Sequence, residues 1–321
     1  MTLQNTIVYK KIYTVLKNAK NILLVCHERP DGDTLGSVCA LIDLCLSEKK
    51  KYAAYCKDQP PVNFLYLPHS NEIISDRLMV DFFNFDLIIA VDCGDIKRTG
   101  LADEIMGRKE NQIFVNIDHH PKVEDYADIE IKDQTSSSTT MLVYDFFKIN
   151  GLEINKQVAT SILTGISVDT GHYLYATTDK TVKISSEMLT HGARIPVIME
   201  KTWRNKTMEG LKLWGKAMAR LETNEKYDLA FTYLKKEEAS RVDKEELEGL
   251  SNFLGNMYGV KGLVLLIQKD DNLIKGSIRS SHPTVDISLL ARIFGGGGHA
   301  KASGFVMEGR IVEEDGKVRI V

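Results

Sequence analysis

The segment at residues 113–121 constrains the fold of this 321-residue chain more than any other stretch. Residues 113–117 form an apolar run that predicts a buried strand. Asp118, His119 and His120 follow at once, and Pro121 then stops the strand. Metal-ligand residue types at the carboxyl end of a buried strand are typical of sites in open α/β sheets. Taken alone, the segment could also be a polar surface turn.

Three more predicted elements end in the same types of residue. Apolar runs at 21–26 and 86–91 predict strands, and residues 157–168 predict a helix. The candidate ligands that follow these elements are His27, Asp31, Asp33, Asp92 and Asp169. Strands that alternate with helices predict right-handed crossovers and a mostly parallel sheet. We therefore expect an α/β fold with flanking helices, in which the ends of these elements form one site.

The length and the order of the elements predict two domains. A chain of 321 residues is long enough for two domains of ordinary size. A helical stretch over about 181–222 gives way to a new strand at 227–234. We expect a first domain at residues 1–205, a helical linker at 206–225 and a smaller α/β domain at 226–321.

The composition excludes several classes of protein. The net charge is −3, so the chain lacks the basic excess of a protein that binds long nucleic acid. The five cysteines have neither zinc-ligand nor redox spacing, which is typical of reduced thiols in a cytosolic protein. The sequence shows neither a signal-peptide pattern nor an apolar run of membrane-spanning length. We expect a cytoplasmic protein with no membrane partner.

The gathered carboxylates require a cation. Carboxylates repel one another strongly at close range, and a pair of divalent ions would neutralise them. Mixed imidazole and carboxylate ligands suit Mn²⁺, Fe²⁺ or Co²⁺ better than Ca²⁺. Two such ions can also lower the pKa of a shared water from ~16 toward ~7. We expect two divalent ions, with Mn²⁺ as the first choice and Co²⁺ or Mg²⁺ as alternatives.

Four motifs, in this order, resemble those of the DHH phosphoesterase superfamily. They are His27-x-x-Pro30-Asp31-x-Asp33-x-x-Gly36-Ser37, Val91-Asp92-Cys93-Gly94, Asp118-His119-His120 and Asp169-Thr170-Gly171. Near the carboxyl end, Arg279-Ser280-Ser281 and the run from Gly295 to Phe305 resemble the DHH-associated substrate-binding domain. Together they resemble the nanoRNase type of this superfamily, which also acts on 3′-phosphoadenosine 5′-phosphate (pAp).

The resemblance implies a role for each candidate ligand. His27 and Asp31 would hold one metal ion. Asp33, His119 and Asp169 would hold the second ion, and the catalytic residue Asp92 would bridge the two. His120 would be catalytic and face the substrate phosphate, while Asp118 would orient a neighbouring imidazole from outside the metal shell.

The resemblance also implies a substrate-binding set in the second domain. Its members are Arg279, Ser280, Gly296, Gly297, Gly298 and His299. Consecutive glycines allow positive φ angles and let backbone N–H groups approach an anion closely. Without its neighbours, the glycine run could equally be only a flexible loop.

The implied function is metal-dependent hydrolysis of short oligoribonucleotides (nanoRNA) to mononucleotides, with pAp as a further substrate. A phosphodiesterase for cyclic or linear dinucleotides is the rival within the same class. A catalytically silent nucleotide-binding regulator is the alternative from another class. The oligomeric state is left open, with a homodimer as one option.

Two features near the predicted site have competing interpretations. The hydroxyl cluster at residues 135–140 is typical of a helix N-cap region. Arg98 follows Asp92 closely and could approach the acidic rim of the site. A solvated salt bridge is the role that the sequence favours for this arginine.

Overall fold

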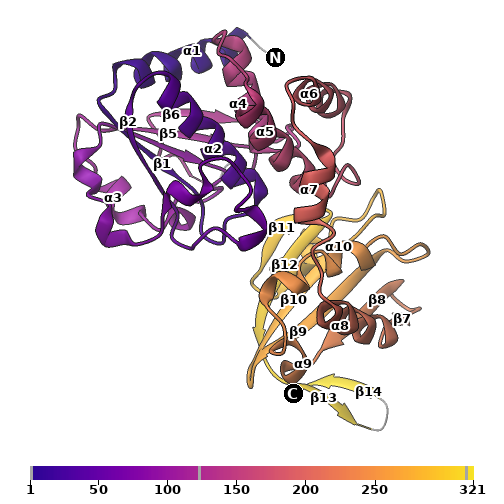
Figure 1. The fold of residues 1–321 in the computed structure, drawn as a ribbon. Helices are drawn as coiled ribbons and strands as arrows, with labels where there is room; N and C mark the ends of the chain where they lie inside the picture. The colour runs from indigo at the N-terminus through magenta and orange to yellow at the C-terminus, as the bar shows by residue number, and fades with distance from the viewer. Residues whose placement is uncertain (1–2, 122–123, 315–316) are drawn as a thin grey trace. The chain divides into compact units, whose positions relative to one another are not determined.

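The computed structural model describes residues 3–121, 124–314 and 317–321, which divide into two compact units at residues 1–205 and 206–321. Figure 1 shows the first unit in indigo to red and the second in orange to yellow. Each unit is built on its own six-stranded sheet with flanking helices. The predicted α/β fold with a mostly parallel sheet and a second α/β domain is therefore confirmed.

The sheet of the first unit is parallel throughout, in the order β3-β2-β1-β4-β5-β6. Its strands are β1 Asn21–Val25, β2 Lys51–Tyr55, β3 Ile73–Ile74, β4 Leu87–Val91, β5 Ile113–Asp118 and β6 Ile129–Lys132. Strands of a parallel sheet are covered on both faces, which is why the central ones are nearly continuous apolar runs. The strands predicted at 21–26, 86–91 and 113–117 correspond to β1, β4 and β5.

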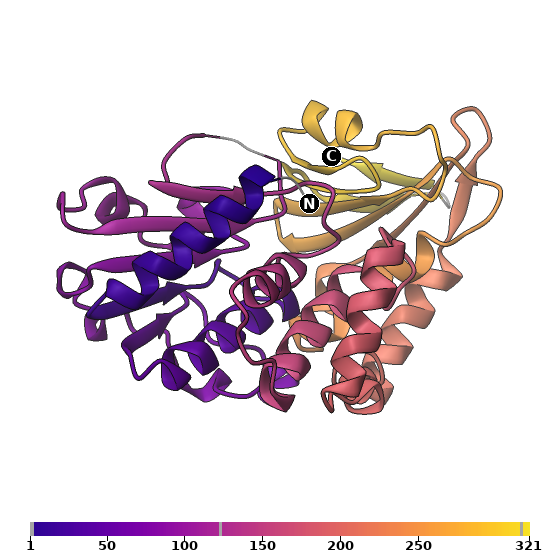
Figure 2. The ribbon, with the colours of Figure 1, turned by 90° about the horizontal axis from the view of Figure 1, so that it is seen from above.

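The helices α1, α2, α4 and α5 cover one face of this sheet, and α3 with short turns covers the other. The α-helices of the unit are α1 Leu3–Asn18, α2 Gly32–Ser47, α3 Ala102–Met106, α4 Thr139–Ile149, α5 Lys156–Asp169, α6 Asp179–Thr190 and α7 Ile195–Thr202. One apolar cluster joins α1, α2, α4 and α5 to alternate strand residues such as Ile22 and Ile89. A second cluster joins Leu23 and Ile88 to α3 and neighbouring turns. Figure 2 shows α1, in indigo, lying against the strands.

The sheet of the second unit is mixed, in the order β11-β12-β10-β9-β8-β7. Its strands are β7 Glu222–Asn224, β8 Leu229–Leu234, β9 Gly262–Asp270, β10 Leu273–Arg279, β11 Gly297–His299 and β12 Ala302–Glu308. The β8–β9 pair is parallel, and the other pairs are antiparallel. A two-stranded sheet follows, formed by β13 Ile311–Glu314 and β14 Lys317–Ile320. The helices are α8 Met208–Ala219, α9 Lys236–Ala239, α10 Leu250–Leu254 and α11 Ser288–Ile293.

The segment at 206–225, which the sequence suggests as a linker, contains α8 and β7. The apolar face of α8 packs into the core of the second unit through Leu213, Trp214 and Ala217. Trp214 Nε1 also donates to the backbone oxygen of Glu246 at 2.8 Å. The amphipathic spacing of α8 is thus explained by its packing against this second core.

None of the helices within the described ranges is long and apolar enough to cross a membrane. All five cysteines are buried and free.

Candidate metal centre

The carboxyl ends of three neighbouring strands carry the first candidate ligands. β1 pairs with β4, and β4 pairs with β5, so their carboxyl ends lie along one edge of the sheet. His27 lies just beyond β1, and Asp92 directly follows β4. Asp118 is the last residue of β5, with His119 after it. The parallel pairing therefore brings together residues that are far apart in the sequence.

Asp31 and Asp33 come from the start of α2. The Asp31 side chain caps this helix by accepting hydrogen bonds from the backbone N–H groups of Asp33 (2.9 Å) and Thr34 (3.1 Å). His27 Nε2 lies 3.7 Å from Asp31 Oδ1 and 3.3 Å from Asp92 Oδ2. The ligand atoms of His27, Asp31 and Asp92 lie within 4.8 Å of one another, which defines the first candidate metal group.

The second candidate metal group consists of Asp33, His119 and Asp169, whose ligand atoms also lie within 4.8 Å of one another. Asp169 is the last residue of α5. His119 Nε2 lies 3.1 Å from Asp169 Oδ2 and 4.0 Å from Asp33 Oδ2. Its distance to Asp92 Oδ1 is 3.6 Å.

Backbone carbonyl groups orient both of these histidines. His27 Nδ1 lies 2.7 Å from the oxygen of Glu28, and His119 Nδ1 lies 3.2 Å from the oxygen of Ser136. A carbonyl oxygen can only accept, so each Nδ1 must carry the proton. Nε2 is then the atom that each ring presents to the carboxylates. Metal-binding histidines are commonly held through their other ring nitrogen in this way.

Asp92 belongs to the first group and also faces His119 of the second. Its Oδ2 faces His27 and its Oδ1 faces His119. Thr139 Oγ1 donates a hydrogen bond to the same Oδ1 at 3.0 Å. The backbone of Asp92 has a φ of 60°, a left-handed conformation that costs a non-glycine residue about 1–3 kcal/mol. Strain of this kind clusters at functional sites, and here it falls on the residue that joins the two groups.

His120 has a different environment from the other two histidines. Its Nδ1 lies 2.9 Å from Asp118 Oδ1 and 3.3 Å from Asp92 Oδ1. The ligand atoms of His120, Asp92 and His119 also lie within 4.8 Å of one another, so these three residues could hold a metal ion. The His120 side chain is 27% exposed, against 2% for His27 and 10% for His119, so it lies nearest to solvent. Because carboxylates occupy Nδ1, a contact with substrate would be made through Nε2.

The hydroxyl cluster does more than cap a helix. Ser138 does cap α4, as the sequence predicts. In addition, Asp33 Oδ2 accepts from Thr139 N (2.6 Å), and Oδ1 accepts from Thr140 N (2.9 Å) and Thr140 Oγ1 (2.8 Å). The positive end of the α4 dipole adds to this stabilisation. No spacing rule predicts the contact, because more than a hundred residues separate Asp33 from this helix.

Lys132 is a second residue that the sequence motifs do not identify. It ends β6, and its side chain is only 8% exposed. Its Nζ lies 3.2 Å from Asp118 Oδ2, the oxygen that also accepts from Gly94 N at 3.1 Å. Asp118 therefore links a buried lysine to the His120 ring. The only signal in the sequence is a lysine at the end of an otherwise alternating strand, beside β5.

The protonation equilibria of the histidines reveal an excess of negative charge. Burial alone would lower the pKa of His119, but its hydrogen bond to Asp169 and the nearby Asp33 and Asp92 raise it to about 11. Burial is likewise outweighed at His120, whose pKa rises to about 9 through Asp118 and Asp92. The pKa of His27 is raised well above its usual range by Asp31 and Asp92.

The carboxylates show the same competition between burial and charge. Burial raises the pKa of Asp33, and the charges of Asp92 and Asp169 raise it further. At Asp92, burial is outweighed by hydrogen bonds with His120 and His27, so the pKa is lowered. The cluster thus draws in protons to offset its own charge, and a divalent cation would take their place.

The donor set fits hard or borderline divalent ions. Both groups offer imidazole nitrogen and carboxylate oxygen, a combination suited to ions such as Mn²⁺. Cys26 and Cys93 adjoin ligands in the sequence, but neither is part of these groups in the described part of the chain. The Cys93 thiol instead donates to the oxygen of Val91 at 3.3 Å.

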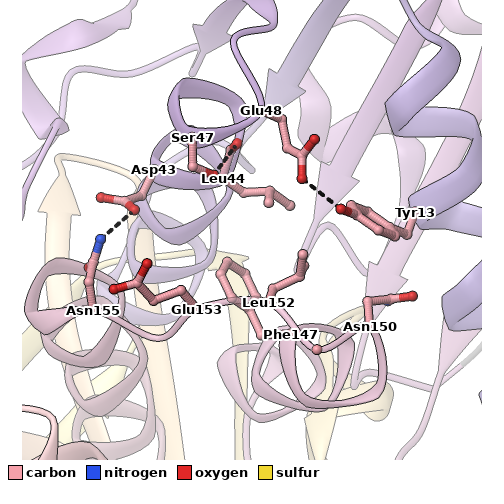
Figure 3. Close-up of a pocket in the computed structure, with 11 residues that line it drawn as sticks. Tyr13, Asp43, Leu44, Ser47, Glu48, Phe147, Asn150, Leu152, Glu153 and Asn155 are labelled. Carbon is pink, nitrogen blue, oxygen red and sulfur yellow. Dashed lines mark hydrogen bonds between the residues drawn. The ribbon is translucent and has the colours of Figure 1, made fainter.

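A surface pocket elsewhere in this unit has a different character. Figure 3 shows it between the carboxyl end of α2 and the α4–α5 connection. Its volume is about 310 Å³. Glu48 accepts a hydrogen bond from the Tyr13 hydroxyl at 2.6 Å, and Asp43 accepts one from Asn155 Nδ2 at 2.8 Å. The pocket contains none of the candidate ligands, and its acidic lining would repel a phosphate.

In the second unit, the residues predicted to bind substrate lie at the ends of β10 and on β11. Arg279 Nε donates to Asn252 Oδ1 at 2.6 Å, which fixes the guanidinium group beside α10. The Ser280 hydroxyl donates to the backbone oxygen of Lys261 at 2.6 Å, so it serves the local structure. His299 is exposed and ends β11, the edge strand of its sheet.

The glycine run is required partly by the hairpin that it forms. A Cβ on Gly296 would lie 2.1 Å from the oxygen of Gly304, and one on Gly298 would lie 2.6 Å from the oxygen of Ala302. Gly298 also has a φ of +136°. Gly297 would meet nothing within 4 Å. Gly297 and Gly298 lie in strand β11, which pairs with β12.

Family comparison defines the class of protein to which this fold and site belong. Residues 21–166 match the family described as "DHH family, N-terminal domain", and residues 227–317 match the "DHHA1 domain". The chain therefore carries a domain of the DHH family followed by a DHHA1 domain. The resemblance seen in the sequence motifs is confirmed.

Individual relatives are similar over both units. The "bifunctional oligoribonuclease and PAP phosphatase NrnA" of Bacillus subtilis is 29% identical over 291 residues, 88% of each chain. The protein of the same name from Thermus thermophilus is 25% identical over 292 residues, 90% of this chain and 84% of the relative. The crystal structure of an exopolyphosphatase-related protein from Bacteroides fragilis superposes with a TM-score of 0.86 at 28% identity, covering 93% of this chain and 90% of that one.

Proposed function

We propose that this protein is a metal-dependent phosphoesterase that hydrolyses short oligoribonucleotides to mononucleotides and removes the 3′-phosphate of pAp. The observation that carries the proposal is the pair of imidazole and carboxylate groups with Asp92 between them, facing His27 of one and His119 of the other. The relatives named as oligoribonuclease and PAP phosphatase support it, because they match most of both units. The five buried thiols support a cytoplasmic location.

The two ligand groups would hold two divalent ions, with Mn²⁺ as our first choice. His27 and Asp31 would serve one ion, and Asp33, His119 and Asp169 the other. Asp92 would contribute one oxygen to each. Bound divalent ions supply charge stabilisation for a phosphate and a nucleophilic water at neutral pH. Thr139, Thr140 and the start of α2 hold the carboxylates in place through backbone and hydroxyl donors.

His120 would act on the substrate directly. In the metal-free protein, Asp118 and Asp92 outweigh burial and raise the pKa of His120 to about 9, and Asp118 accepts a hydrogen bond from Nδ1 of the protonated ring. The proton on Nε2 would then be donated to an oxygen of the reacting phosphate. A donor placed where negative charge develops typically contributes about 10²–10³ to the rate. Asp118 and Lys132 would fix the direction of this donor.

The second unit would recognise the nucleotide. We propose that Arg279, Gly297 and His299 contact a phosphate or the terminal nucleotide, while Ser280, Gly296 and Gly298 shape the hairpin and strand ends that carry them. Exposed backbone on an edge strand can approach an anion closely. Few cationic contacts are available in this set, which favours a short substrate over a long strand.

A substrate panel tests the proposal. The purified protein would be assayed with Mn²⁺, Mg²⁺ and Co²⁺ on pAp, linear and cyclic dinucleotides, pyrophosphate and RNAs up to twenty-four nucleotides long. We expect the highest kcat/KM on RNAs of about two to five nucleotides, with a shallow dependence on salt. Preference for cyclic dinucleotides would favour the phosphodiesterase alternative. Nucleotide binding without turnover would favour a silent regulator, and a steep salt dependence with preference for long RNA would contradict the short-substrate proposal.

A further inference from the structure

Arg98 is positioned by two of the loops that build the candidate metal centre. It lies on a short 3₁₀ turn at Ile96–Thr99, directly after the segment that contains Asp92. Its N–H donates to the oxygen of Asp95 at 3.0 Å, and its own oxygen accepts from Glu28 N at 2.7 Å. Glu28 adjoins the ligand His27. The backbone of Arg98 is thus tied both to the loop after β4 and to the loop after β1.

The guanidinium group of Arg98 lies on the same side of this loop as His120. Gly94 has a φ of +55°, and a Cβ built on it would lie 3.6 Å from His120 Cγ and 3.7 Å from Arg98 Nη1. The side chains of His120 and Arg98 therefore both flank Gly94. Gly94 N donates a hydrogen bond to Asp118, the residue that orients His120. Gly94 therefore lies beside Arg98 and His120 and is bonded to Asp118.

Arg98 has no carboxylate partner among the described residues, in contrast to Arg77 and Arg108 of the same unit. Arg77 Nη2 pairs with Glu104, and Arg108 Nη2 lies 2.7 Å from Asp128. No acidic oxygen lies within 4.0 Å of the Arg98 guanidinium nitrogens among residues 3–121, 124–314 and 317–321, so the solvated salt bridge that the sequence favours is not found there. Arg98 is half-buried and lies beside a cluster of aspartates but pairs with none of them. A cation in this position is suited to bind an anion from solution.

We propose that Arg98 is a substrate-binding residue that, together with His120, receives the non-bridging oxygens of the phosphate being hydrolysed. This inference rests on the proposed function and deepens it. A guanidinium group stays charged at all accessible pH values, and its planar set of donors matches phosphate oxygens in a bidentate manner. Arg98 would thus supply positive charge from the protein itself, beside the metal groups and within reach of the same phosphate as His120.

Substitution of Arg98 in the Mn²⁺-loaded protein tests this role. We expect Arg98→Ala to lower kcat/KM on pAp and on dinucleotides by about 10²–10³-fold with unchanged metal content. Arg98→Lys should retain an intermediate activity, because it keeps the charge but loses the bidentate geometry. Lys97→Ala is the matched control, since it removes an exposed charge from the same turn. Activity of Arg98→Ala equal to that of Lys97→Ala, or loss of metal from Arg98→Ala, would overturn the proposal.

Chemical rescue separates a substrate contact from a structural role. Millimolar guanidinium ion should restore part of the turnover of Arg98→Ala and leave Lys97→Ala unchanged. If Arg98→Ala does not fold, Arg98→Gln replaces it in the same comparison. Absence of any rescue in a folded, metal-loaded variant would contradict direct phosphate binding.

A binding measurement distinguishes failure of this inference from failure of the proposed function. If the wild-type protein turns over none of the nucleotides, the proposed function fails, and calorimetric titration of the Mn²⁺-loaded protein with inorganic phosphate decides on Arg98. A loss of affinity of at least about tenfold in Arg98→Ala, with none in Lys97→Ala, would support the phosphate site. Equal affinities in the two variants, or no phosphate binding by the wild type, would overturn it.

Discussion

The first unit buries its candidate functional side chains, whereas the second unit exposes the most distinctive of its own. Asp33 and Asp118 are fully buried, and His27 is almost so, in a cluster whose charges repel. By contrast, Gly297 and His299 are exposed on the edge strand β11. A buried group of like charges persists only if something compensates for it, and an exposed strand needs no such compensation. The comparison therefore supports the proposal that the first unit carries the chemistry and the second recognises the substrate.

The two units also differ in how their residues are held. In the first, backbone donors from α2 and α4 fix Asp31 and Asp33, so the carboxylates are oriented before any ion binds. In the second, the glycines are needed for the close approach of β11 to β12, while Gly297 meets nothing that would exclude a side chain. In the first unit, polar contacts determine the positions of the candidate site residues. In the second unit, the shape of the backbone determines them. Substitutions should separate these two kinds of dependence.

The largest effect is expected for Asp92→Ala. Removal of the shared carboxylate should weaken both ligand groups, so that activity falls by more than about 10³-fold, further than for His27→Ala or His119→Ala. Metal content by mass spectrometry and kcat on pAp would be measured together. The exposed carboxylate in Asp103→Asn is the control. Two tightly held Mn²⁺ ions in Asp92→Ala would refute the bridging role.

His120→Ala should separate catalysis from metal binding. We expect both ions to stay bound while kcat falls by about 10²–10³-fold, because a donor to the reacting phosphate is lost. His191→Ala, which removes a partly exposed histidine on the same unit, should leave both quantities unchanged. A fall in metal content in His120→Ala would show that His120 is a metal ligand. The geometry permits this role, because the ligand atoms of His120, Asp92 and His119 also lie within 4.8 Å of one another.

His299→Ala should have a smaller effect of a different kind. If the second unit only recognises the nucleotide, KM for dinucleotides should rise by about tenfold, the cost of one hydrogen bond to a charged group, with little change in kcat. Metal content should be unaffected. Lys226→Ala, an exposed charge in the same unit, serves as control. A loss in kcat as large as that of His120→Ala would contradict the proposal that the second unit only recognises the nucleotide.

The smallest expected effect concerns the stability of the metal-free protein, to which the two units contribute with opposite pH dependences. The folded-state pKa of His119 is raised from 6.5 to about 11, so its contribution to stability is complete below about 6.5 and is lost as the pH rises toward 11. The pKa of Glu238, which is partly buried and bonded to Arg220, is lowered from 4.5 to about 2. Its contribution is present above about 4.5 and is lost as the pH falls toward 2.

Hydrogen exchange would resolve these dependences by unit. With a chelator present, β4 should lose protection between pH 7 and 10, while β9 should lose it first below pH 4. Glu238→Gln should remove the acid-side change only. Increasing protection of β4 as the pH rises would contradict the account of the cluster.

Much of this architecture follows from the sequence, because buried parallel strands are continuous apolar runs and their ends carry motif residues. Asp92 and His119 could be assigned to one edge for that reason. The contacts of Asp33 with Thr139 and Thr140 could not, since they depend on the direction of a helix that lies far along the chain. The role of Lys132 does not follow from the sequence either, because an isolated lysine usually lies on the surface. The packing of α8 into the second unit depends on tertiary contacts that periodicity does not specify.

The central claim is that the buried cluster of the first unit is a site for divalent metal ions. Calorimetric titration of the metal-free protein with Mn²⁺ at pH 7, in buffers of different ionisation enthalpy, tests it most directly. We predict two ions per chain, with release of protons from the ligands His27 and His119, whose pKa values the aspartates raise in the metal-free state. Asp92→Ala should abolish the saturable binding. No saturable binding by the wild type, or binding without proton release that Asp92→Ala leaves intact, would contradict the claim.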